Sequence, residues 1–303
     1  MKVILIGHRG ALGRGLYEYL SRSHQVTGWD VEEDLFSLDA GYLRDSGFDV
    51  VVNLALIADR GSPTYRIDSP SEKVNVDGPR HIARALKDSG IHWIQMSTRE
   101  VLGPVYTETD VVKTAQDFRP RFLVGESQPY DPRNFYGKSK VVTEFIAESY
   151  PRTTIIRLTT GYTDYFHPTS QNWIIKVIQS VMETGKARLS NGGRQFRDPL
   201  HTDDLGALIE RVVAQGIVGE RLHAGGGSDN LISLRELVTL VDREVAIEDV
   251  PGGDWGFAFD NAKATTLTGW VPQVSIRAKI PVIAENIRNG ITEAADVPDE
   301  DRA

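Results

Sequence analysis

The hydrophobic positions along the chain fall into short apolar runs separated by longer amphipathic stretches. A short run bounded by glycine or polar residues predicts a buried strand, because a strand covered on both faces needs no polar side. Such runs occupy residues 3–6, 25–29, 49–54, 93–96 and 154–158. Apolar residues spaced three to four apart predict helices. These stretches are 12–21, 74–89 and 134–150, and in the second of them Ile82, Ala85 and Leu86 share one side.

The order of these elements indicates the fold class. Strands that alternate with helices indicate an α/β protein with a doubly wound, Rossmann-type parallel sheet. After about residue 160 the pattern loosens into short elements punctuated by glycine and polar residues. We therefore expect a first domain over 1–160 and mainly a smaller second lobe over 161–295, from which about 197–215 returns to the first domain. Residues 296–303 are expected to be a disordered tail, and the cleft between the lobes is the expected site.

Composition and charge exclude several classes of function. The chain has 303 residues, 40% hydrophobic and 25% charged, with a net charge of -8 and no cysteine. The acidic balance disfavours nucleic acid and anionic membranes as partners. The missing thiols exclude disulfides, thiolate metal sites and cysteine nucleophiles. The apolar run at the N-terminus is too short for a secretory signal or a membrane span. We expect a cytoplasmic protein without a membrane partner, nucleic acid or bound metal.

A glycine-rich loop, GHRGALGRG, follows the first predicted strand and opens the first predicted helix. Gly7 permits the tight turn, Gly10 lets a pyrophosphate approach the backbone, and Gly13 lets the helix pack on the strand. The spacing is GxxGxxG, a variant of the commoner GxGxxG. The pattern predicts a dinucleotide site, in which free N–H groups at the helix start meet the phosphates. The alternative is a glycine-rich turn without a ligand.

Asp30, at the end of the second predicted strand, bears on which dinucleotide binds. A carboxylate at this position accepts hydrogen bonds from the adenosine ribose hydroxyls and repels the extra phosphate of NADP. Arg9, inside the glycine loop, is placed to pair with that phosphate instead. We favour NAD and keep NADP as the alternative.

The stretch NFYGKSK places Tyr136 and Lys140 four residues apart on a helix that Asn134 is suited to cap. Free tyrosine has a pKa of about 10, too high for acid–base work near neutrality. A nearby ammonium favours the phenolate, and the same lysine is suited to hold the nicotinamide ribose. The alternative is a surface tyrosine stacked on a lysine stem.

Taken together, these motifs resemble the extended short-chain dehydrogenases/reductases, the NAD-dependent epimerase/dehydratase group that modifies nucleotide sugars. The matching pieces run from Val3 to about Ile276. They are GHRGALG, Asp30, NLALIA (53–58), NVDG (75–78), STREVLG (97–103), YGKSK, RDPLHTDDL (197–205) and TGWVPQVSI (268–276).

The resemblance implies a role for each matching residue. Thr98, Tyr136 and Lys140 would form the family's catalytic triad, with Tyr136 exchanging the proton of the sugar hydroxyl. Arg197 would hold the diphosphate, which suits the planar fork of an arginine; the alternative is a salt bridge to Asp203 or Asp204. Other residues expected along the dinucleotide are Ala11, Leu12, Asp34, Leu35, Leu54, Ala55 and Asn75. Those expected around the substrate are Arg99, Asn172 and Trp255.

Arg99 and Glu100 bear on the reaction. In the family's 4,6-dehydratases this stretch reads Thr-Asp-Glu, where the aspartate is the acid that expels a hydroxyl and the glutamate is the base. Arginine stays protonated and is a poor general acid. Simple elimination is therefore disfavoured, although Glu100 keeps elimination or C5 epimerisation open. The alternative is that Arg99 and Glu100 pair with each other or with substrate polar groups. A 4-epimerase, acting through a transient 4-keto sugar, needs only the triad and NAD.

Several alternatives remain open from the sequence. GHRG and FHPTS (166–170) resemble stretches of the NADPH-dependent GDP-fucose synthases. Those enzymes also use a cysteine, which this chain lacks, so an NAD(P)H-dependent keto-sugar reductase is the runner-up. A dehydratase-like enzyme with an altered acid is a further possibility, and a dinucleotide sensor without catalysis is the non-enzymatic one. The family resemblance also implies a homodimer, formed through helices that include residues 141–150.

Overall fold

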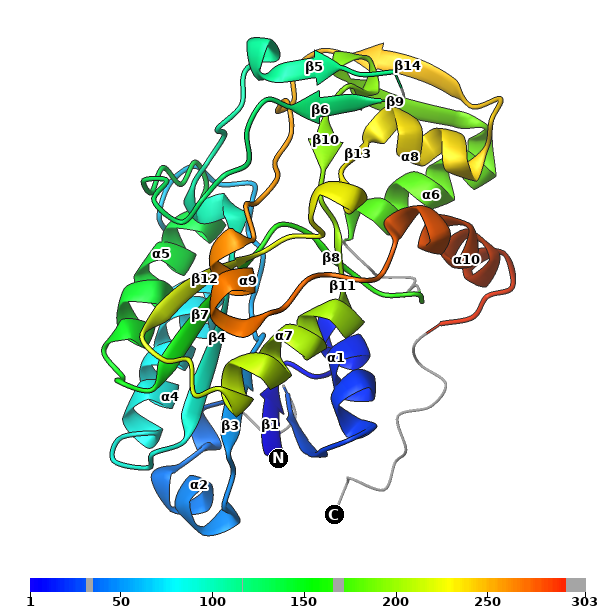
Figure 1. Cartoon of the computed structure of the whole chain (residues 1–303). Helices are drawn as coiled ribbons and strands as arrows, with labels where there is room; N and C mark the ends of the chain where they lie inside the picture. Colours follow the sequence, from blue (N-terminus) through cyan, green and yellow to red (C-terminus); the bar gives the residue numbers. More distant parts are fainter. Residues whose placement is uncertain (31–34, 116, 166–171, 293–303) are drawn as a thin grey trace.

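The computed structural model describes residues 1–30, 35–115, 117–165 and 172–292. Its centre is a six-stranded sheet in which all neighbouring strands are parallel (Figure 1). In spatial order the strands are β2 (Gln25–Trp29), β1 (Lys2–Ile6), β3 (Val50–Asn53), β4 (His92–Thr98), β7 (Thr153–Leu158) and β12 (Glu220–Ala224). The predicted doubly wound α/β sheet is confirmed. Its order reverses at β1, because the chain passes first to β2 and then to β3 on the other side.

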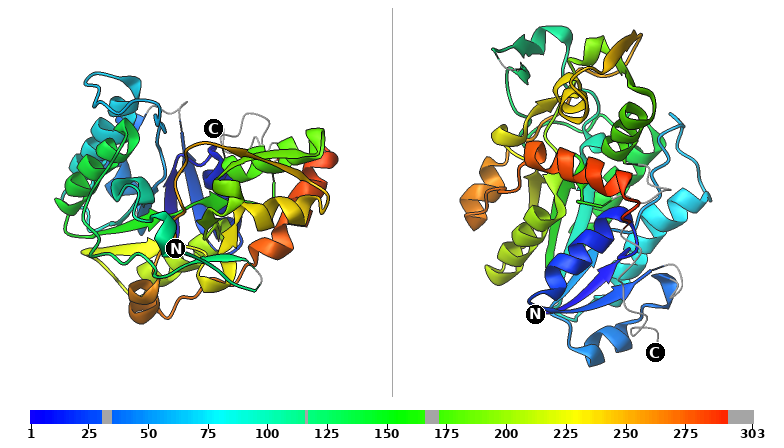
Figure 2. Two further views of the ribbon diagram at one scale, coloured as in Figure 1. Left: turned by 90° about the horizontal axis from the view of Figure 1, so that it is seen from above. Right: turned by 90° about the vertical axis from the view of Figure 1, so that its right-hand side faces the viewer.

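Helices cover both faces of this sheet (Figures 1 and 2). One face carries α1 (Ala11–Ser21) and α7 (Thr202–Ala214), and α9 (Ala262–Thr268) lies beside β12. The other face carries α2 (Ala40–Ser46), α4 (Gly78–Ala85) and α5 (Phe135–Glu148). Alternate residues of β1 divide between the two cores: Val3 and Leu5 pack with α1 and α7, while Ile4 and Ile6 pack with α2 and α4. This alternation follows from the two-residue period of a strand.

The helix predicted over 74–89 is interrupted. The structure has a short α3 (Pro70–Glu72), a π-helical turn η2 (Lys73–Asp77) and then α4, which ends at Ala85. The carbonyl of Asn75 accepts a hydrogen bond from the Thr143 hydroxyl of α5, and the Asn75 side chain bonds the backbone of Ile57. These contacts draw the turn toward α5, so the pattern of apolar residues survives while the regular helix does not.

The second lobe has a separate hydrophobic core, built on helices α6 (Trp173–Thr184), α8 (Leu234–Val241) and α10 (Ile276–Arg288). Four two-stranded sheets accompany the central one. They pair β5 (Val111–Lys113) with β6 (Phe118–Pro120), β8 (Gly161–Tyr162) with β11 (Leu200–His201), β9 (Lys186–Ser190) with β14 (Ala246–Val250), and β10 (Phe196–Arg197) with β13 (Ile232–Ser233). Short turns of 3-10 helix are η1 (Leu35–Ser37), η3 (Arg99–Val101), η4 (Glu108–Asp110), η5 (Asn191–Gly193) and η6 (Ser228–Asn230).

The chain returns from the second lobe to the central sheet and stays there beyond residue 215. Helix α7 packs on α1, and β12 then pairs with β7 along its whole length. We predicted no strand at β12. Its sequence, ERLHA, begins with the charged Glu220 and Arg221, which are partly exposed, so only its last residues are buried. An edge strand of this kind has no apolar run to reveal it.

Three predictions fall on residues outside those the structure describes: Asp34, the FHPTS stretch and the tail at 296–303. Over the described ranges, none of the helices combines the length and the apolar character needed to span a bilayer. Within the same ranges, no group of three or more His, Asp or Glu side chains is placed to hold a metal ion.

Asp198 is a buried carboxyl in the link between β10 and β11. Its Oδ2 accepts the N–H of Phe259 at 2.9 Å, whereas its Oδ1 has no hydrogen-bond partner among the described residues. Burial raises the pKa of Asp198 to about 8, only partly opposed by the Phe259 N–H. The carboxyl therefore holds its proton at neutral pH in the folded protein.

We expect Asp198→Asn to become more stable relative to the wild type as the pH rises from 5 to 8. The folded pKa lies above the unfolded value of about 3.9, so over this range the carboxyl is ionised in the unfolded chain and protonated in the folded protein, and the wild type loses stability by up to about 1.4 kcal/mol per pH unit. Asparagine keeps an acceptor for Phe259 and has no proton to lose. Urea unfolding of both proteins at pH 5, 6.5 and 8 measures the difference. A difference in stability that stays constant across this range would contradict the prediction.

Candidate active site

The glycine loop lies at the point where the strand order reverses, which is where open α/β sheets bind ligands. Gly7 has a φ of +84°, and a Cβ on it would lie 2.9 Å from the backbone nitrogen of Ala55, which follows β3. A Cβ on Gly13 would overlap the carbonyl oxygen of Gly7. Gly10 is the N-cap of α1 and makes no side-chain hydrogen bond to it. The first N–H groups of α1, those of Ala11 and Leu12, have no acceptor within the helix and lie beside this loop. These residues fit a dinucleotide pyrophosphate.

Asp30 follows β2 and holds the glycine loop. Its Oδ2 accepts the backbone N–H of Arg9 at 2.8 Å and lies 3.7 Å from Nδ1 of His8. The Arg9 carbonyl in turn accepts a hydrogen bond from Nε of Arg14 at 2.9 Å. A carboxylate in this place fits the ribose role expected with NAD, and the position of Arg9 at its side leaves the NADP alternative a prediction.

The remaining predicted dinucleotide residues come from three places: Leu54 and Ala55 follow β3, Asn75 lies in η2 and Leu35 lies in η1. The backbone N–H of Leu54 bonds the Ile6 carbonyl at 2.9 Å, which brings this segment against the glycine loop. Leu35 packs against Gly78 at the start of α4. Asn75 is fully buried, and its side chain bonds both the N–H and the carbonyl of Ile57. Asn75 therefore shapes the segment beside the loop, and its direct contact with a cofactor stays a prediction.

The predicted triad comes together at the end of β4 and the start of α5. Thr98 is the last residue of β4, while Tyr136 and Lys140 lie one turn apart on α5, and all three are buried. Asn134 caps α5 by accepting the N–H of Gly137 at 2.8 Å, as predicted. A Cβ on Gly137 would overlap the carbonyl oxygen of Glu100, so glycine lets α5 approach the end of β4 closely.

We expected Lys140 to lower the pKa of Tyr136, but other groups and burial account for its shift. Burial raises the pKa of Tyr136, and Arg60 and a hydrogen bond from Thr98 lower it. Burial also lowers the pKa of Lys140 to about 8, opposed by the Glu144 carboxylate one turn further along α5. Nζ of Lys140 donates to the Met96 carbonyl of β4 at 2.9 Å.

Arg99 and Glu100 do pair with each other, as the sequence left open. The guanidinium of Arg99 lies 3.4 Å from Glu100 Oε1 and also 3.4 Å from Oδ2 of Asp254. The other Glu100 oxygen accepts a hydrogen bond from the Asn134 amide at 3.1 Å. Arg99 additionally lies over the ring of Phe257, with Cζ 5.2 Å from the centroid. Arg99 thus links the triad region to the second lobe.

Arg197 is paired with Asp254, and not with the alternative partners Asp203 and Asp204. Its NH2 lies 2.8 Å from Asp254 Oδ1. Burial would raise the pKa of Asp254, but Arg197 and Arg99 outweigh it and lower the pKa. We name these three residues the Arg99–Asp254–Arg197 cluster. The correction has a simple cause: Asp203 and Asp204 begin α7, whereas Asp254 comes from a loop more than fifty residues away in sequence.

The other predicted substrate residues lie near this cluster. Asn172 caps α6, accepting the N–H of Ile174 at 3.0 Å, and its amide donates to the Gly161 carbonyl at 2.8 Å. The ring of Trp173 lies under Arg197, with Cζ 5.9 Å from its centroid. Trp255 lies under Arg194 instead, with Cζ 4.9 Å from its ring. Asn172 therefore precedes a residue that contacts Arg197, and Trp255 follows Asp254 of the cluster; the contact of Asn172 and Trp255 with a substrate stays a prediction.

Sequence reasoning missed two charged residues of the site, Asp254 and Arg60. Asp254 stands in a glycine-rich loop, and Arg60 stands in the irregular segment after β3. Neither position has a periodic pattern or a motif that marks it. The nearest sequence signal for Asp254 is the presence of Arg99 and Arg197 in the site. Two arginines that are buried together need a carboxylate to balance their charge.

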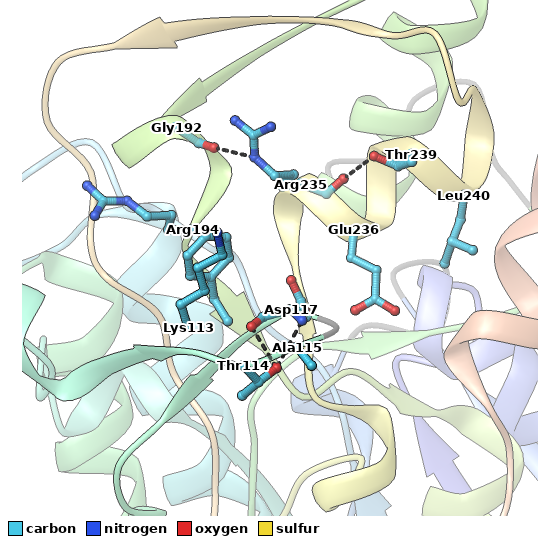
Figure 3. A pocket seen from close by; sticks show the side chains of 11 residues that line it. Lys113, Thr114, Ala115, Asp117, Gly192, Arg194, Arg235, Glu236, Thr239 and Leu240 are labelled. Carbon is cyan, nitrogen blue, oxygen red and sulfur yellow. Dashed lines mark hydrogen bonds between the residues drawn. The ribbon is translucent and has the colours of Figure 1, made fainter.

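A cavity of about 520 Å³ lies elsewhere, among the β5–β6 hairpin, η5 and α8 of the second lobe (Figure 3). No predicted catalytic residue lines it. Its polar side chains bond backbone carbonyls of the lining: Nε of Arg235 donates to the Gly192 carbonyl at 3.1 Å, and the Thr114 hydroxyl donates to the Asp117 carbonyl at 2.8 Å. The predicted triad therefore lies outside this cavity, and its catalytic role stays a prediction.

Comparisons with known proteins identify the family. Residues 3–225 match the family described as "NAD dependent epimerase/dehydratase family". A dTDP-glucose 4,6-dehydratase from Mycobacterium tuberculosis is 27% identical over 220 residues, which are 68% of this chain and 62% of that protein. A CDP-paratose 2-epimerase from Salmonella typhi is 27% identical over 274 residues, covering 81% of this chain and 78% of that one.

Among solved structures, a UDP-glucuronic acid 4-epimerase from Bacillus cereus, in complex with UDP-glucuronic acid and NAD, has a TM-score of 0.78. It is 20% identical, and the match covers 95% of this chain and 99% of that one, which supports the fold alone. The matched part of the M. tuberculosis relative is less than two thirds of its length. The family match covers well over half of the present chain, and it names the dinucleotide that the glycine loop fits. The chain belongs to the NAD dependent epimerase/dehydratase family.

Proposed function

We propose that this protein epimerises a nucleotide-activated hexose through a transient 4-keto sugar. The observation that carries the proposal is the convergence of Thr98, Tyr136 and Lys140 at the same carboxyl edge of the sheet as the glycine loop, with a paired arginine where a dehydratase would have its acid. NAD, when bound, supplies the redox chemistry that interconverts a sugar hydroxyl and a ketone. Lys140 and the residues of the glycine loop are those that would hold it.

The chain's own residues divide the remaining work. Tyr136 accepts the proton of the sugar hydroxyl as the ketone forms and returns it as the hydroxyl re-forms. Thr98 donates a hydrogen bond to the same sugar oxygen. Arg197, freed from part of its contact with Asp254, binds a phosphate oxygen pair of the nucleotide. The keto sugar turns over between its formation and its reduction. The carbon is therefore reduced on its opposite face, and the hydroxyl re-forms with inverted configuration.

Elimination is the second candidate, because Glu100 is present and relatives of this chain include dehydratases. Expulsion of a hydroxyl needs a proton donor beside the base. Arg99 cannot serve as that donor, since a guanidinium holds its proton at any working pH. Glu100 is bound to Arg99 and to the Asn134 amide, which supports a structural and not a proton-transfer role.

We expect the protein, loaded with NAD, to convert one of the UDP-, dTDP- or GDP-hexoses into its epimer without net change in absorbance at 340 nm. Proton NMR in deuterated water identifies the product. Deuterium at C5 together with a 6-deoxy-4-keto sugar would instead establish a dehydratase. Net consumption of NADPH with a keto sugar would establish a reductase, and tight NAD(P) binding without any turnover would establish a sensor. The homodimer expected from the family also belongs to this proposal, and light scattering tests it.

A further inference from the structure

Arg60 lies in the irregular segment 54–69 between β3 and α3, which folds over the first turn of α5. The N–H of Phe135 donates to the Ser62 carbonyl at 2.7 Å, and the N–H of Tyr136 donates to the Asp59 carbonyl at 3.1 Å. These N–H groups belong to the first turn, where the helix itself offers no acceptor. The backbone on both sides of Arg60 is therefore fixed to the turn that carries Tyr136.

The Arg60 side chain lies over the tyrosine ring. Its Cζ is 5.1 Å from the Tyr136 centroid, and its Nε is 3.9 Å from Glu100 Oε1. A cation within about 6 Å of an aromatic face is attracted to it. Because 54% of the Arg60 side chain is exposed, this residue does not fill the core. Its place over a buried phenol therefore calls for an electrostatic explanation.

Among the described residues, the charged groups that act on the phenol are Arg60, from the segment after β3, and Glu100, from η3, which is paired with Arg99. Lys140 lies one turn further along α5, and its Nζ donates to the Met96 carbonyl. Burial is the largest cause that raises the pKa of Tyr136, and Glu100 adds to it. Arg60 is the leading group that opposes the rise, ahead of the Thr98 hydroxyl.

We propose that Arg60 is a positioning residue for Tyr136: its guanidinium, held between the phenol ring and Glu100, stabilises the phenolate form. The inference rests on the proposed function in that the phenolate is the form that accepts the sugar proton. Arg60 itself gives up no proton and contacts no reacting atom. It offsets the negative charge of Glu100, which would otherwise oppose ionisation of the phenol.

The test compares Arg60→Gln, Arg60→Lys and a matched control, Arg66→Gln, in the NAD-loaded protein. Arg66 lies on the same segment and its Cζ is 5.8 Å from the ring of Phe135, which cannot ionise. Carbon-13 labelling of tyrosine, with Tyr136→Phe to assign the signal, follows the phenol by NMR from pH 8 up to the highest pH at which the protein stays folded. Far-UV circular dichroism checks that each protein stays folded over this range.

We expect Tyr136 to ionise at a higher pH in Arg60→Gln than in the wild type, in Arg60→Lys or in Arg66→Gln. Where a substrate is turned over, the acidic limb of the kcat/KM profile should move to higher pH in Arg60→Gln. Below that limb, kcat/KM should fall about 2- to 5-fold, the scale of an exposed cation–π contact, with NAD affinity unchanged. High salt should shrink the difference, because Arg60 is half exposed.

The outcomes separate the two proposals. If no sugar nucleotide is turned over but the phenol titration still shifts, the role of Arg60 stands and the proposed function falls. If turnover occurs and the wild type and Arg60→Gln share one titration, the role of Arg60 is wrong. An equal shift in Arg66→Gln, which removes the ion pair of Arg66 with Asp59 and leaves Arg60 in place, would also overturn it, because the effect would then not be specific to the Arg60 charge.

Discussion

Replacing Glu144 by glutamine is expected to destabilise the protein by about 3–5 kcal/mol, because it leaves a buried arginine without its counter-charge. Glu144 and Arg157 are both almost fully buried, on α5 and β7. Nε of Arg157 lies 2.9 Å from Glu144 Oε1, and NH2 lies 2.7 Å from Oε2. The Tyr130 hydroxyl adds a hydrogen bond to Oε2 at 2.7 Å, and Ser97 donates to Oε1. A glutamine can neither carry the charge nor accept all four bonds.

Urea unfolding of Glu144→Gln measures this loss. The double variant Glu144→Leu with Arg157→Met should recover much of it, because a buried ion pair is often replaced by apolar residues at little cost. The matched control is Glu18→Gln on α1, whose pair with Arg22 is about half exposed. This control should cost no more than about 0.5 kcal/mol. A loss of that size in Glu144→Gln would mean that the buried pair does not stabilise the fold.

The substitution Tyr136→Phe should lower turnover by roughly 10²-fold or more, the usual scale for losing an acid–base group. The phenol is buried beside Thr98, and phenylalanine has no hydroxyl with which to exchange the sugar proton. Phenylalanine keeps the ring under Arg60 and the backbone bond of residue 136 to Asp59. NAD affinity should therefore stay near that of the wild type.

Kinetic assays with the active sugar nucleotide and calorimetric titration with NAD measure the two effects. Tyr150→Phe is the control, since it removes another buried hydroxyl close to the end of α5. That hydroxyl donates to the Ile91 carbonyl at 2.7 Å, and its loss should cost stability and leave turnover unchanged. Wild-type turnover in Tyr136→Phe would show that the catalytic assignment is wrong.

Regular patterns in the sequence predicted much of the fold. The strands β1 and β7 could be predicted from their apolar runs, because helices cover both faces of those strands. The cap at Asn134 and the glycine turn at Gly7 follow from local chemistry, and the structure confirms both. Strand β12 was not predicted because it lies at the sheet edge and begins with the charged residues Glu220 and Arg221.

The site residues that the sequence did not reveal share one property: their partners are far away along the chain. Asp254 belongs to the site because it pairs with Arg99 and Arg197, which come from two other elements. Arg60 belongs to it because its guanidinium lies over the ring of Tyr136 on α5. Single-residue patterns record which residues are buried, whereas pairing between distant segments depends on how the elements pack, and no periodicity encodes it.

The Arg99–Asp254–Arg197 cluster has a consequence for ligand affinity. The guanidinium of Arg197 is already paired with the Asp254 carboxylate. Under the proposed function, a diphosphate that binds Arg197 therefore replaces this carboxylate as its counter-ion. The net attraction is smaller than two bare arginines would provide. Affinity for a charged ligand should consequently depend only weakly on ionic strength, and discrimination should come from the shape and hydrogen bonding of the sugar.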